Sequence, residues 1–309
     1  MAVNGFPMIG GGAGPPQARR AAAPAPAALR ANGFDAPGAF AIARRLVGFG
    51  PRPAGSPAER RSAAYLRALL PHGRFEPVPG GLRNIAGELP GSGRPIAVIA
   101  HYDTTPVAGY LGANNSAAAV GAVVEIGRAL RAQRTPPGAA PVVLLLTDGE
   151  EAPDYPPADF ERTALRGSRA AASGPYRHAR AAIVLDFVGQ RGLRIPRELN
   201  SDAGLWAKLR AAARSVGAQA VFPGATQEPI LDDHIPFKGR GIPAIDLIDF
   251  DYPCWQKRCD TLDKLSPRSI DAAGETVLAL VRSLRRDTVS PSATGGPTSG
   301  GQVAASGTP

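Results

Sequence analysis

The sequence is poor in several residue types that mark specialised classes of protein. Its 309 residues include only two cysteines, two tryptophans and four histidines, and aromatic residues make up 6% of the chain. Two cysteines are too few for a metal site built from two pairs of thiolates. No apolar run approaches the roughly 20 residues of a transmembrane helix, so we expect no membrane partner. The hydrophobic fraction of 44% is normal for a globular core.

Lysine is scarce as well. The formal net charge is +9, but the chain has only four lysines, so arginine supplies nearly all of its positive charge. Clustered basic residues interleaved with aromatic ones would indicate nucleic-acid binding. The basic residues are instead scattered along the sequence, and no such alternation occurs. We therefore expect a solvated basic surface and no nucleic-acid partner.

Both ends of the sequence have compositions that disfavour a packed core. Residues 1–35 are rich in Gly, Ala and Pro, and residues 287–309 consist mainly of Ser, Gly, Thr and Pro. Segments with so few large apolar residues bury too little surface to fold, so we predict a disordered leader and a disordered tail. A single domain is expected between them, over residues 36–286. No secretory signal is legible in the leader, which leaves a cytoplasmic and an exported location open.

The central part of the chain alternates between strand and helix patterns. Short apolar runs bounded by turn residues predict buried strands over residues 96–100, 142–147, 183–187 and 244–248. Apolar residues at helical spacing predict helices over residues 56–70, 116–134, 201–216 and 266–284. Most of these helices begin at or just after a serine that is able to cap the first turn. The alternation predicts an α/β fold, a three-layer sandwich in which helices flank a mostly parallel, mixed central sheet.

Titratable residues lie where the predicted strands end. His101 and Asp103 follow the first strand, Glu150 and Glu151 follow the second, and Asp186 lies near the end of the third. In an open α/β sheet the carboxyl ends of the strands are where ligands bind. We therefore predict that these five residues form one site.

Each of these residues has a structural and a functional interpretation. Asp103 is placed to orient the His101 imidazole, as carboxylates do beside metal-binding histidines, although an isolated His-x-Asp is more often an ordinary loop hydrogen bond. Glu150 and Glu151 form either a solvated acidic turn or a metal site with one ligand and one general base. Asp186 lies in an apolar stretch, so its burial requires a partner.

Two further stretches have more than one interpretation. Asp232, Asp233 and His234 precede an apolar pair, either as the cap of a helix N-terminus or as substrate-side groups of the same pocket. Cys254 and Cys259 lie in one loop with a tryptophan between them, and they form either a local disulfide or two free thiols. Neither stretch decides between its alternatives by itself.

These motifs occur in the order found in a known family. The chain resembles the zinc aminopeptidase and glutaminyl cyclase family, in particular its bacterial glutaminyl-cyclase-like branch, over nearly all of the predicted domain. The motifs that carry the resemblance are residues 49–56, 100–103, 112–115, 148–152, 167–169, 185–189, 232–237 and 255–266. The resemblance implies a mixed sheet flanked by helices, with a zinc pocket at the strand ends.

By position, the resemblance implies a role for each residue at the strand ends. His101 and Asp186 bind one zinc ion, and Glu151 binds a second. Glu150 is the general base, and Asp103 orients His101.

The resemblance also adds residues from the later motifs. Asp232 is a further catalytic carboxylate. Asp233, His234 and Trp255 line the substrate side of the pocket, where the Trp255 ring walls the space for a small side chain.

The chain departs from the family at two metal ligands. The family has an aspartate where this sequence has Asn115, and a histidine where it has Gln256. A neutral side-chain amide is a poor donor to zinc. We therefore expect at most one zinc ion, held by His101, Asp186 and Glu151, or no metal at all.

Two other groups bear on this choice, Lys257 if no metal is bound and the cysteines if one is. Lys257 lies where the family usually has a small polar residue, so its ammonium group would partly neutralise the carboxylates. A thiolate ligand from Cys254 or Cys259 is the least favoured alternative, because nothing in the family supports it.

Two functions follow from this resemblance. The first is a zinc-dependent enzyme that acts on peptide N-termini, either as an aminopeptidase or as a cyclase that converts N-terminal glutamine into pyroglutamate. The retained His101, Glu150 and Asp186 favour it. The second is a non-catalytic descendant that binds a peptide or a small amine without turnover, which Asn115 and Gln256 favour. The sequence does not predict the oligomeric state.

Overall fold

The computed structural model describes residue 29 and residues 33–286. The predicted tail and most of the predicted leader lie outside these residues. Leu29 and Phe34, which the sequence placed in the leader, pack against the hydrophobic core. The Asp35 side chain accepts a hydrogen bond from the backbone N–H of Gly38 at the start of the first helix. The packed part of the chain therefore begins before residue 36.

The centre of the fold is a six-stranded mixed sheet with the strand order β1-β2-β4-β3-β5-β8. Strands β3, β4, β5 and β8 are parallel, whereas β1 and β2 run antiparallel to their neighbours. The strands are β1 (Arg74–Val78), β2 (Leu82–Leu89), β3 (Ile96–His101), β4 (Val142–Thr147), β5 (Ala181–Leu185) and β8 (Ala244–Leu247). A separate parallel pair is formed by β6 (Arg197–Glu198) and β7 (Thr226–Gln227). The predicted mixed, mostly parallel sheet is confirmed.

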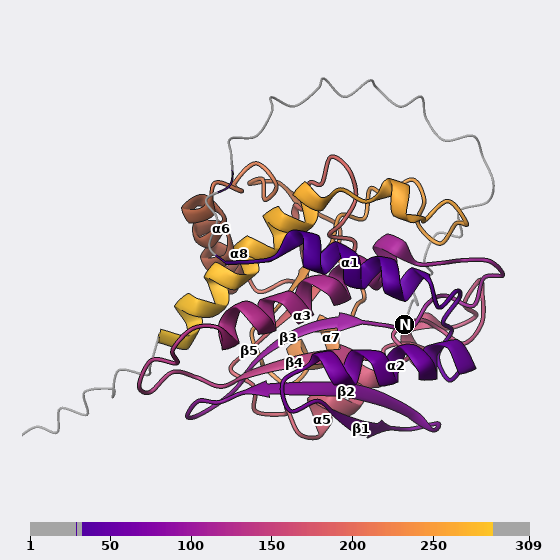
Figure 1. Ribbon diagram of the computed structural model, residues 1–309, viewed down its shortest axis with the longest axis horizontal. Helices are drawn as coiled ribbons and strands as arrows, with labels where there is room; N and C mark the ends of the chain where they lie inside the picture. The colour runs from indigo at the N-terminus through magenta and orange to yellow at the C-terminus, as the bar shows by residue number, and fades with distance from the viewer. Residues whose placement is uncertain (1–28, 30–32, 287–309) are drawn as a thin grey trace, which may run out of the picture.

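Helices cover the sheet on both sides. They are α1 (Ala36–Val47), α2 (Pro57–Leu69), α3 (Ala118–Arg131), α4 (Phe160–Thr163), α5 (Arg166–Ser173), α6 (Ala203–Val216), α7 (His234–Lys238) and α8 (Pro267–Arg286). Two short segments are not α-helical: η1 (Ala113–Ala117) is a π-helical turn, and η2 (Leu262–Lys264) is a 3₁₀ turn. Figure 1 shows α1, α3 and α8 together on one side of the sheet and α5 on the other.

The central strands are buried on both faces. In β3, Ile96 and Val98 belong to the core that also contains residues of α1, α3 and α8, whereas Ala97 and Ile99 belong to the core beside α5 and α7. Successive side chains of a strand point to opposite faces, so a strand covered on both sides needs apolar residues throughout. This is why β3 and β4 are continuous apolar runs.

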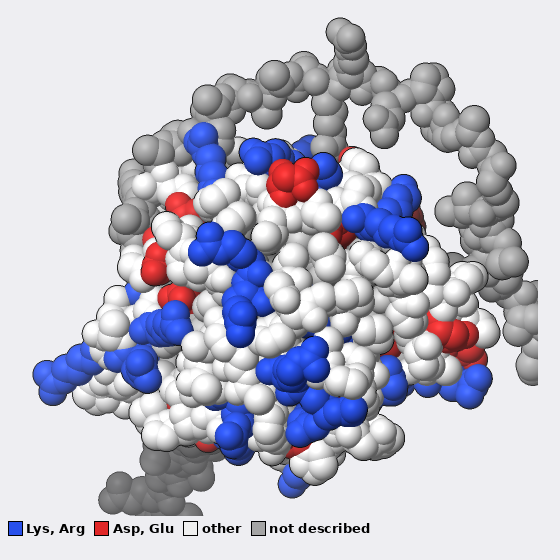
Figure 2. Space-filling model, turned by 45° about the vertical axis from the view of Figure 1, so that its right-hand side comes forward, with Lys and Arg blue, Asp and Glu red and all other residues white. Residues whose placement is uncertain are grey.

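Basic residues are distributed over the surface in separate groups. On the face in Figure 2, Lys and Arg side chains lie in several patches with uncharged surface between them. Among the helices of the described residues, none is long and apolar enough to cross a membrane. The scattered pattern agrees with the one read from the sequence.

Arg52 is a fully buried cation that fixes the loops beside β3. Its guanidinium donates hydrogen bonds of 3.0 Å to the carbonyls of Leu46, Gly50 and Leu111, and a longer one of 3.4 Å to that of Gly112. Burial lowers the pKa of Arg52 to about 10. Because Gly112 is three residues before Asn115, this arginine helps to hold the segment that carries Asn115.

Replacing Arg52 by methionine, which has a similar length but no donors, should destabilise the fold. Arg52→Met leaves several buried carbonyl groups without a donor, so we expect the free energy of unfolding to fall by at least roughly 3 kcal/mol. Urea unfolding followed by circular dichroism measures this loss. Arg61→Met, at an exposed position of α2, is the matched control and should change stability by less than about 0.5 kcal/mol. Equal effects of the two variants would contradict the role given to Arg52.

Candidate functional site

Three parallel strands deliver the predicted site residues to one edge of the sheet. His101 is the last residue of β3, Asp186 follows β5 directly, and Glu150 follows β4 within three residues. The His101 Nδ1 atom lies 3.4 Å from an Asp103 oxygen and 3.9 Å from a Glu150 oxygen, and its Nε2 atom lies 3.6 Å from Asp186 Oδ1. All of these side chains are buried. The predicted grouping of His101, Asp103, Glu150 and Asp186 is therefore present.

Asn115 lies between His101 and Glu151. Its Oδ1 atom is 2.6 Å from His101 Nε2, and its Nδ2 atom donates a 2.8 Å hydrogen bond to Glu151 Oε1. A carboxylate only accepts hydrogen bonds, so the amide must turn its NH₂ group toward Glu151 and its oxygen toward His101. In that orientation, which an ionised Glu151 requires, the hydrogen bond between Asn115 and His101 places a proton on Nε2.

Gln256 completes this arrangement. Its Nε2 atom lies 3.4 Å from Glu151 Oε2, so the two oxygens of Glu151 each face a side-chain amide. We call His101, Asn115, Glu151 and Gln256 the amide cluster. Its two amides stand at the positions where the sequence led us to look for an aspartate and a histidine.

Asp103 contacts His101 and also holds the turn after β4. Its two oxygens accept 3.2 Å hydrogen bonds from the backbone N–H groups of Glu150 and Glu151. The side chain is fully buried, so these bonds and the adjacent imidazole are what compensates its charge. Asp103 thereby fixes the two glutamates relative to His101.

Burial and mutual repulsion shape the protonation of the site. Burial raises the pKa of Glu150 well above its ordinary value, and the charge of Glu151 raises it further against the opposing effect of His101. Burial also raises the pKa of Glu151 to about 7. For His101, burial acts to lower the pKa, but the carboxylates of Glu150, Asp103 and Asp186 outweigh it and hold the pKa well above 6.5. The site therefore favours an imidazolium ion beside partly protonated acids.

The Asp232–His234 stretch is divided between two environments. Asp233 precedes α7 and accepts a hydrogen bond from Thr147 at the end of β4, whereas its side chain makes no capping bond to the helix. Burial raises the pKa of Asp232 well above its ordinary value, and the charges of Asp186 and Asp233 add to the effect. The two aspartates are thus electrostatic neighbours of the strand-end residues.

His234 does not lie on the substrate side, contrary to the expectation from sequence. Its ring is fully buried, with Nε2 at 3.3 Å from Glu198 and Nδ1 at 4.0 Å from Asp246. The two acids lie on opposite sides of the imidazole, so the three residues form an internal polar group. The reason is topological, since α7 turns His234 toward β8, which carries Asp246.

Aromatic residues form an exposed edge beside the amide cluster. Trp255 and Phe250 are each 40% exposed, and their ring centroids are 5.1 Å apart. Phe187, directly after Asp186, packs edge-on against Phe250. Trp255 also precedes Gln256 in the chain, so this edge is continuous with the cluster.

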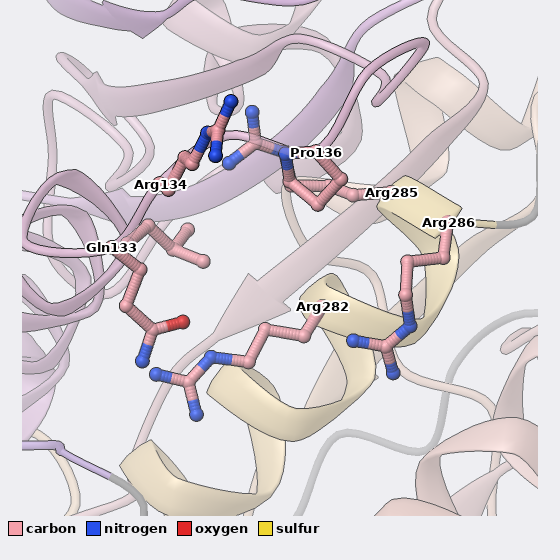
Figure 3. Close-up of a pocket in the computed structure, with 7 residues that line it drawn as sticks. Gln133, Arg134, Pro136, Arg282, Arg285 and Arg286 are labelled. Carbon is pink, nitrogen blue, oxygen red and sulfur yellow. The ribbon is translucent and has the colours of Figure 1, made fainter.

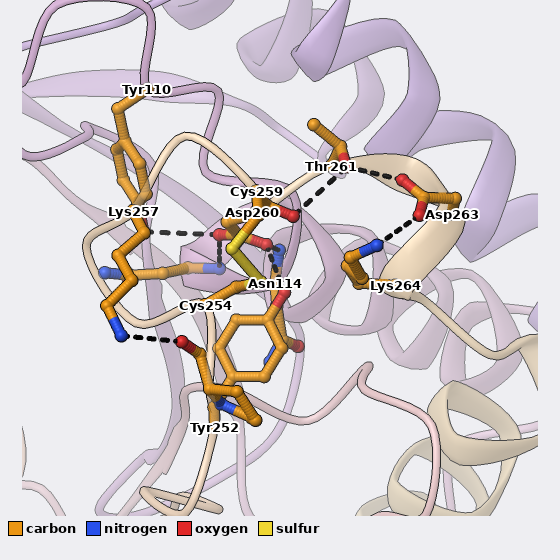
Figure 4. Close-up of a disulfide and its surroundings, with 12 residues drawn as sticks. Tyr110, Asn114, Tyr252, Cys254, Lys257, Cys259, Asp260, Thr261, Asp263 and Lys264 are labelled. Atoms are coloured by element: carbon orange, nitrogen blue, oxygen red, sulfur yellow. Dashed lines mark hydrogen bonds and ion pairs between the residues drawn. A yellow bond between two sulfur atoms is a disulfide. The ribbon is translucent and has the colours of Figure 1, made fainter. Parts of the chain in front are cut away.

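The loop that carries Trp255 and Gln256 is closed by a disulfide. Cys254 and Cys259 are bonded to each other (Figure 4), which decides between the two alternatives left open by the sequence and excludes a thiolate ligand. Lys257 is exposed and donates to the carbonyl of Pro253, so it does not contact the carboxylates that we expected it to neutralise.

Asp260 joins this loop to the Asn115 segment. Its carboxylate, which is fully buried, accepts bonds of 2.9 and 3.1 Å from the backbone N–H groups of Asn114 and Asn115. It also accepts hydrogen bonds from the hydroxyls of Tyr110 and Tyr252 (Figure 4). The sequence motif contained Asp260, but nothing local to it indicated that its partners lie so far away in the chain.

The order and geometry of these groups agree with one family model. Residues 84–281 match the model for peptidase family M28. The chain belongs to this family. The strand-end residues and the loop after β8 all lie within the matched segment.

Relatives of this M28 chain include both cyclases and peptidases. It is 29% identical to a glutaminyl-peptide cyclotransferase-like protein of Mus musculus, over 71% of this chain and 68% of the mouse protein. A glutaminyl cyclase of Bacteroides thetaiotaomicron, solved with bound N-acetylhistamine, is 26% identical with a TM-score of 0.73, over 82% of this chain and 99% of that one. A leucine aminopeptidase precursor of the same bacterium is also 26% identical with a TM-score of 0.73, over 82% and 98%.

M28 relatives of this kind imply zinc, but the residues of the amide cluster do not fit it. A neutral side-chain amide is a poor donor to zinc, and the amides of Asn115 and Gln256 contact the remaining ligand positions, with Asn115 Oδ1 at 2.6 Å from His101 Nε2. Both Glu151 oxygens face amide nitrogens. Among the residues that the structure describes, no three His, Cys, Asp or Glu side chains are grouped to hold a metal ion.

Asp260→Asn should loosen the contact between the disulfide loop and the Asn115 segment. An asparagine replaces one accepting oxygen by an NH₂ group that faces donors, so we expect the free energy of unfolding to fall by about 2 kcal/mol. Urea unfolding measures the change. Asp263→Asn, at an exposed position of the same loop, removes the same charge and should leave stability close to that of the unmodified chain. A similar loss in both variants would show that Asp260 has no special role.

Proposed function

We propose that this M28 chain binds the amino group of a peptide N-terminus, or of a small amine, without zinc-dependent turnover. The observation that carries the proposal is the placement of Asn115, whose amide is hydrogen-bonded on one side to His101 and on the other to Glu151. A neutral amide therefore stands where the family has an aspartate ligand, and it links two other ligand positions.

The charge balance of the site favours a cationic ligand. The buried acids near His101 are Asp103, Glu150, Glu151, Asp186, Asp232 and Asp233. One imidazolium brings a single positive charge to these six acids, and burial together with the neighbouring acids raises the pKa of Glu150 and of Asp232. An ammonium ion brings a charge and three hydrogen-bond donors to such a cluster.

The aromatic edge supplies the second half of the recognition. Trp255 and Phe250 expose large ring surfaces next to Gln256. Aromatic faces attract both apolar side chains and cations. A ligand with an amino group and an adjacent side chain therefore suits this site.

A second candidate function is the zinc-dependent peptidase or cyclase chemistry of the relatives. It is favoured by the retained contacts of His101 with Asp103, Glu150 and Asp186, at 3.4, 3.9 and 3.6 Å. Glu150 is the residue that would hold and transfer a proton at the substrate in that case. The two candidates differ in metal content and in turnover.

Zinc content separates the two candidates. We expect the purified chain to hold clearly less than one tightly bound zinc per molecule, because two ligand positions carry amides. The paired substitution Asn115→Asp with Gln256→His should raise the zinc content and introduce aminopeptidase or cyclase turnover. Elemental analysis and assays with N-terminal glutamine peptides measure both properties.

The control for this experiment is Asn200→Asp with Gln219→His, which makes the same chemical changes outside the amide cluster. It should leave the zinc content unchanged. Two zinc ions in the unmodified chain, or no response of zinc content to the paired substitution, would contradict the proposed role of Asn115 and Gln256.

Amine binding is a direct test of the proposal. A dipeptide with a free N-terminal glutamine should bind at least about tenfold more tightly than its N-acetylated form, because acetylation removes the ammonium charge. Tryptophan fluorescence measures both affinities, since Trp255 is exposed whereas Trp206 is buried. Glu150→Gln should reduce the preference for the free amine, and Glu88→Gln, an exposed position of β2, should preserve it. Equal affinity for the two dipeptides would exclude recognition of the amino group.

A further inference from the structure

A second candidate site lies in a small basic pocket remote from the amide cluster. Four arginines line it together with a glutamine, and its volume is about 50 Å³. The side chains that matter here are Gln133, Arg134, Arg282, Arg285 and Arg286 (Figure 3). Drug-sized ligands need several hundred cubic ångströms, so this pocket is of a size for a small ion or a single charged group.

The basic pocket lies at the opposite edge of the sheet from the amide cluster. The main chain of Ala140, two residues before β4, donates to the carbonyl of Arg285 near the end of α8. The pocket is therefore next to the amino end of β4, whereas Glu150 and Glu151 follow its carboxyl end. The start of α8 is at the amide-cluster edge, where Ser266 N–H donates to the carbonyl of Gly189. A ligand in the basic pocket would not contact the M28 site residues.

Arg285 is held rigidly in the wall of the pocket. Its Nε atom donates a 2.9 Å hydrogen bond to the carbonyl of Ala140, and an Nη2 bond of 2.8 Å goes to the carbonyl of Pro90. Its side chain is buried. A guanidinium fixed by backbone acceptors on one side is a preorganised donor on the other.

The remaining arginines add positive charge from two elements. Arg282 and Arg286 are one turn apart on α8, and the charge of Arg286 lowers the pKa of Arg282 in addition to the effect of burial. Arg134 comes from the segment after α3, and Figure 3 shows Gln133 of that segment directed toward the Arg282 guanidinium. Within the described residues, Arg134 and Arg286 make no hydrogen bond or ion pair with another side chain.

Helix-end electrostatics alone accounts for only part of this arrangement. Cations near a helix C-terminus are stabilised by the macrodipole, which covers the presence of Arg285 and Arg286 in the last turn of α8. The dipole does not require arginines of a second element to line the same hollow. Like charges one turn apart also repel each other, so the convergence costs free energy that an anion would recover.

We propose that the basic pocket binds a phosphate-type oxyanion, either as the free ion or as a phosphomonoester group. Guanidinium groups match phosphate oxygens geometrically and donate two parallel hydrogen bonds each. A carboxylate is satisfied by a single bidentate arginine, whereas four arginines from two elements suit an anion with several oxygens and more than one charge. Among the residues that the structure describes, Glu275 interacts electrostatically with Arg282 and offsets one of the four positive charges.

Calorimetric titration of the full chain with sodium phosphate tests the proposal. Ionic strength is held constant with sodium chloride, so that general screening does not enter. We expect saturable phosphate binding that Arg134→Gln with Arg286→Gln weakens by at least about tenfold, the equivalent of one lost charge-assisted hydrogen bond. Both positions are exposed, so the double variant should fold, which circular dichroism checks.

The matched control is Arg61→Gln with Arg214→Gln, which removes the same charge from exposed positions of α2 and α6. It should keep the phosphate affinity within about twofold of the unmodified chain. Competition by phenyl phosphate would assign a phosphomonoester ligand, and its failure would assign the free ion. No preference of the chain for phosphate over chloride, or equal phosphate affinities in the two double variants, would overturn the proposal.

Discussion

The hydrogen bonds of Asn115 are the interaction on which the chemistry of the site depends. A single amide joins His101 to Glu151, with its oxygen 2.6 Å from the imidazole Nε2 and its nitrogen donating to the glutamate. The amide holds the family geometry together at a point where the acids would otherwise repel each other. It does so without the charge of a metal ion, which is the basis of the proposed binding of an ammonium group.

Buried charged groups outside the site hold the amide in position. Arg52 binds the carbonyls that precede the Asn115 segment, and Asp260 accepts its backbone N–H groups. Neither group touches the expected ligand. Each is compensated by several hydrogen bonds, which is the condition under which a buried charge contributes to order rather than to instability. The position of the amide is therefore set by the surrounding loops as much as by its own contacts.

The parts of the fold with continuous apolar patterns could be predicted from the sequence, because strands β3 and β4 are buried on both faces and leave no room for polar residues. The β1–β2 hairpin was not predicted. Strand β1 lies at the sheet edge, is mostly half-exposed and contains Pro77, so its pattern is weak. Within the site, the position of His234 could not be predicted from the sequence. The acids beside its ring come from β6 and β8, and only the tertiary fold brings them together.

The disulfide loop links recognition to the redox conditions under which the chain folds. A bridge between cysteines five residues apart closes a small ring, so it adds little to global stability. It does restrict the segment that presents Trp255 and Gln256 to the ligand. Reducing conditions would thus alter the surface proposed to recognise the ligand, while the sheet and its helices stay folded and the melting point stays normal.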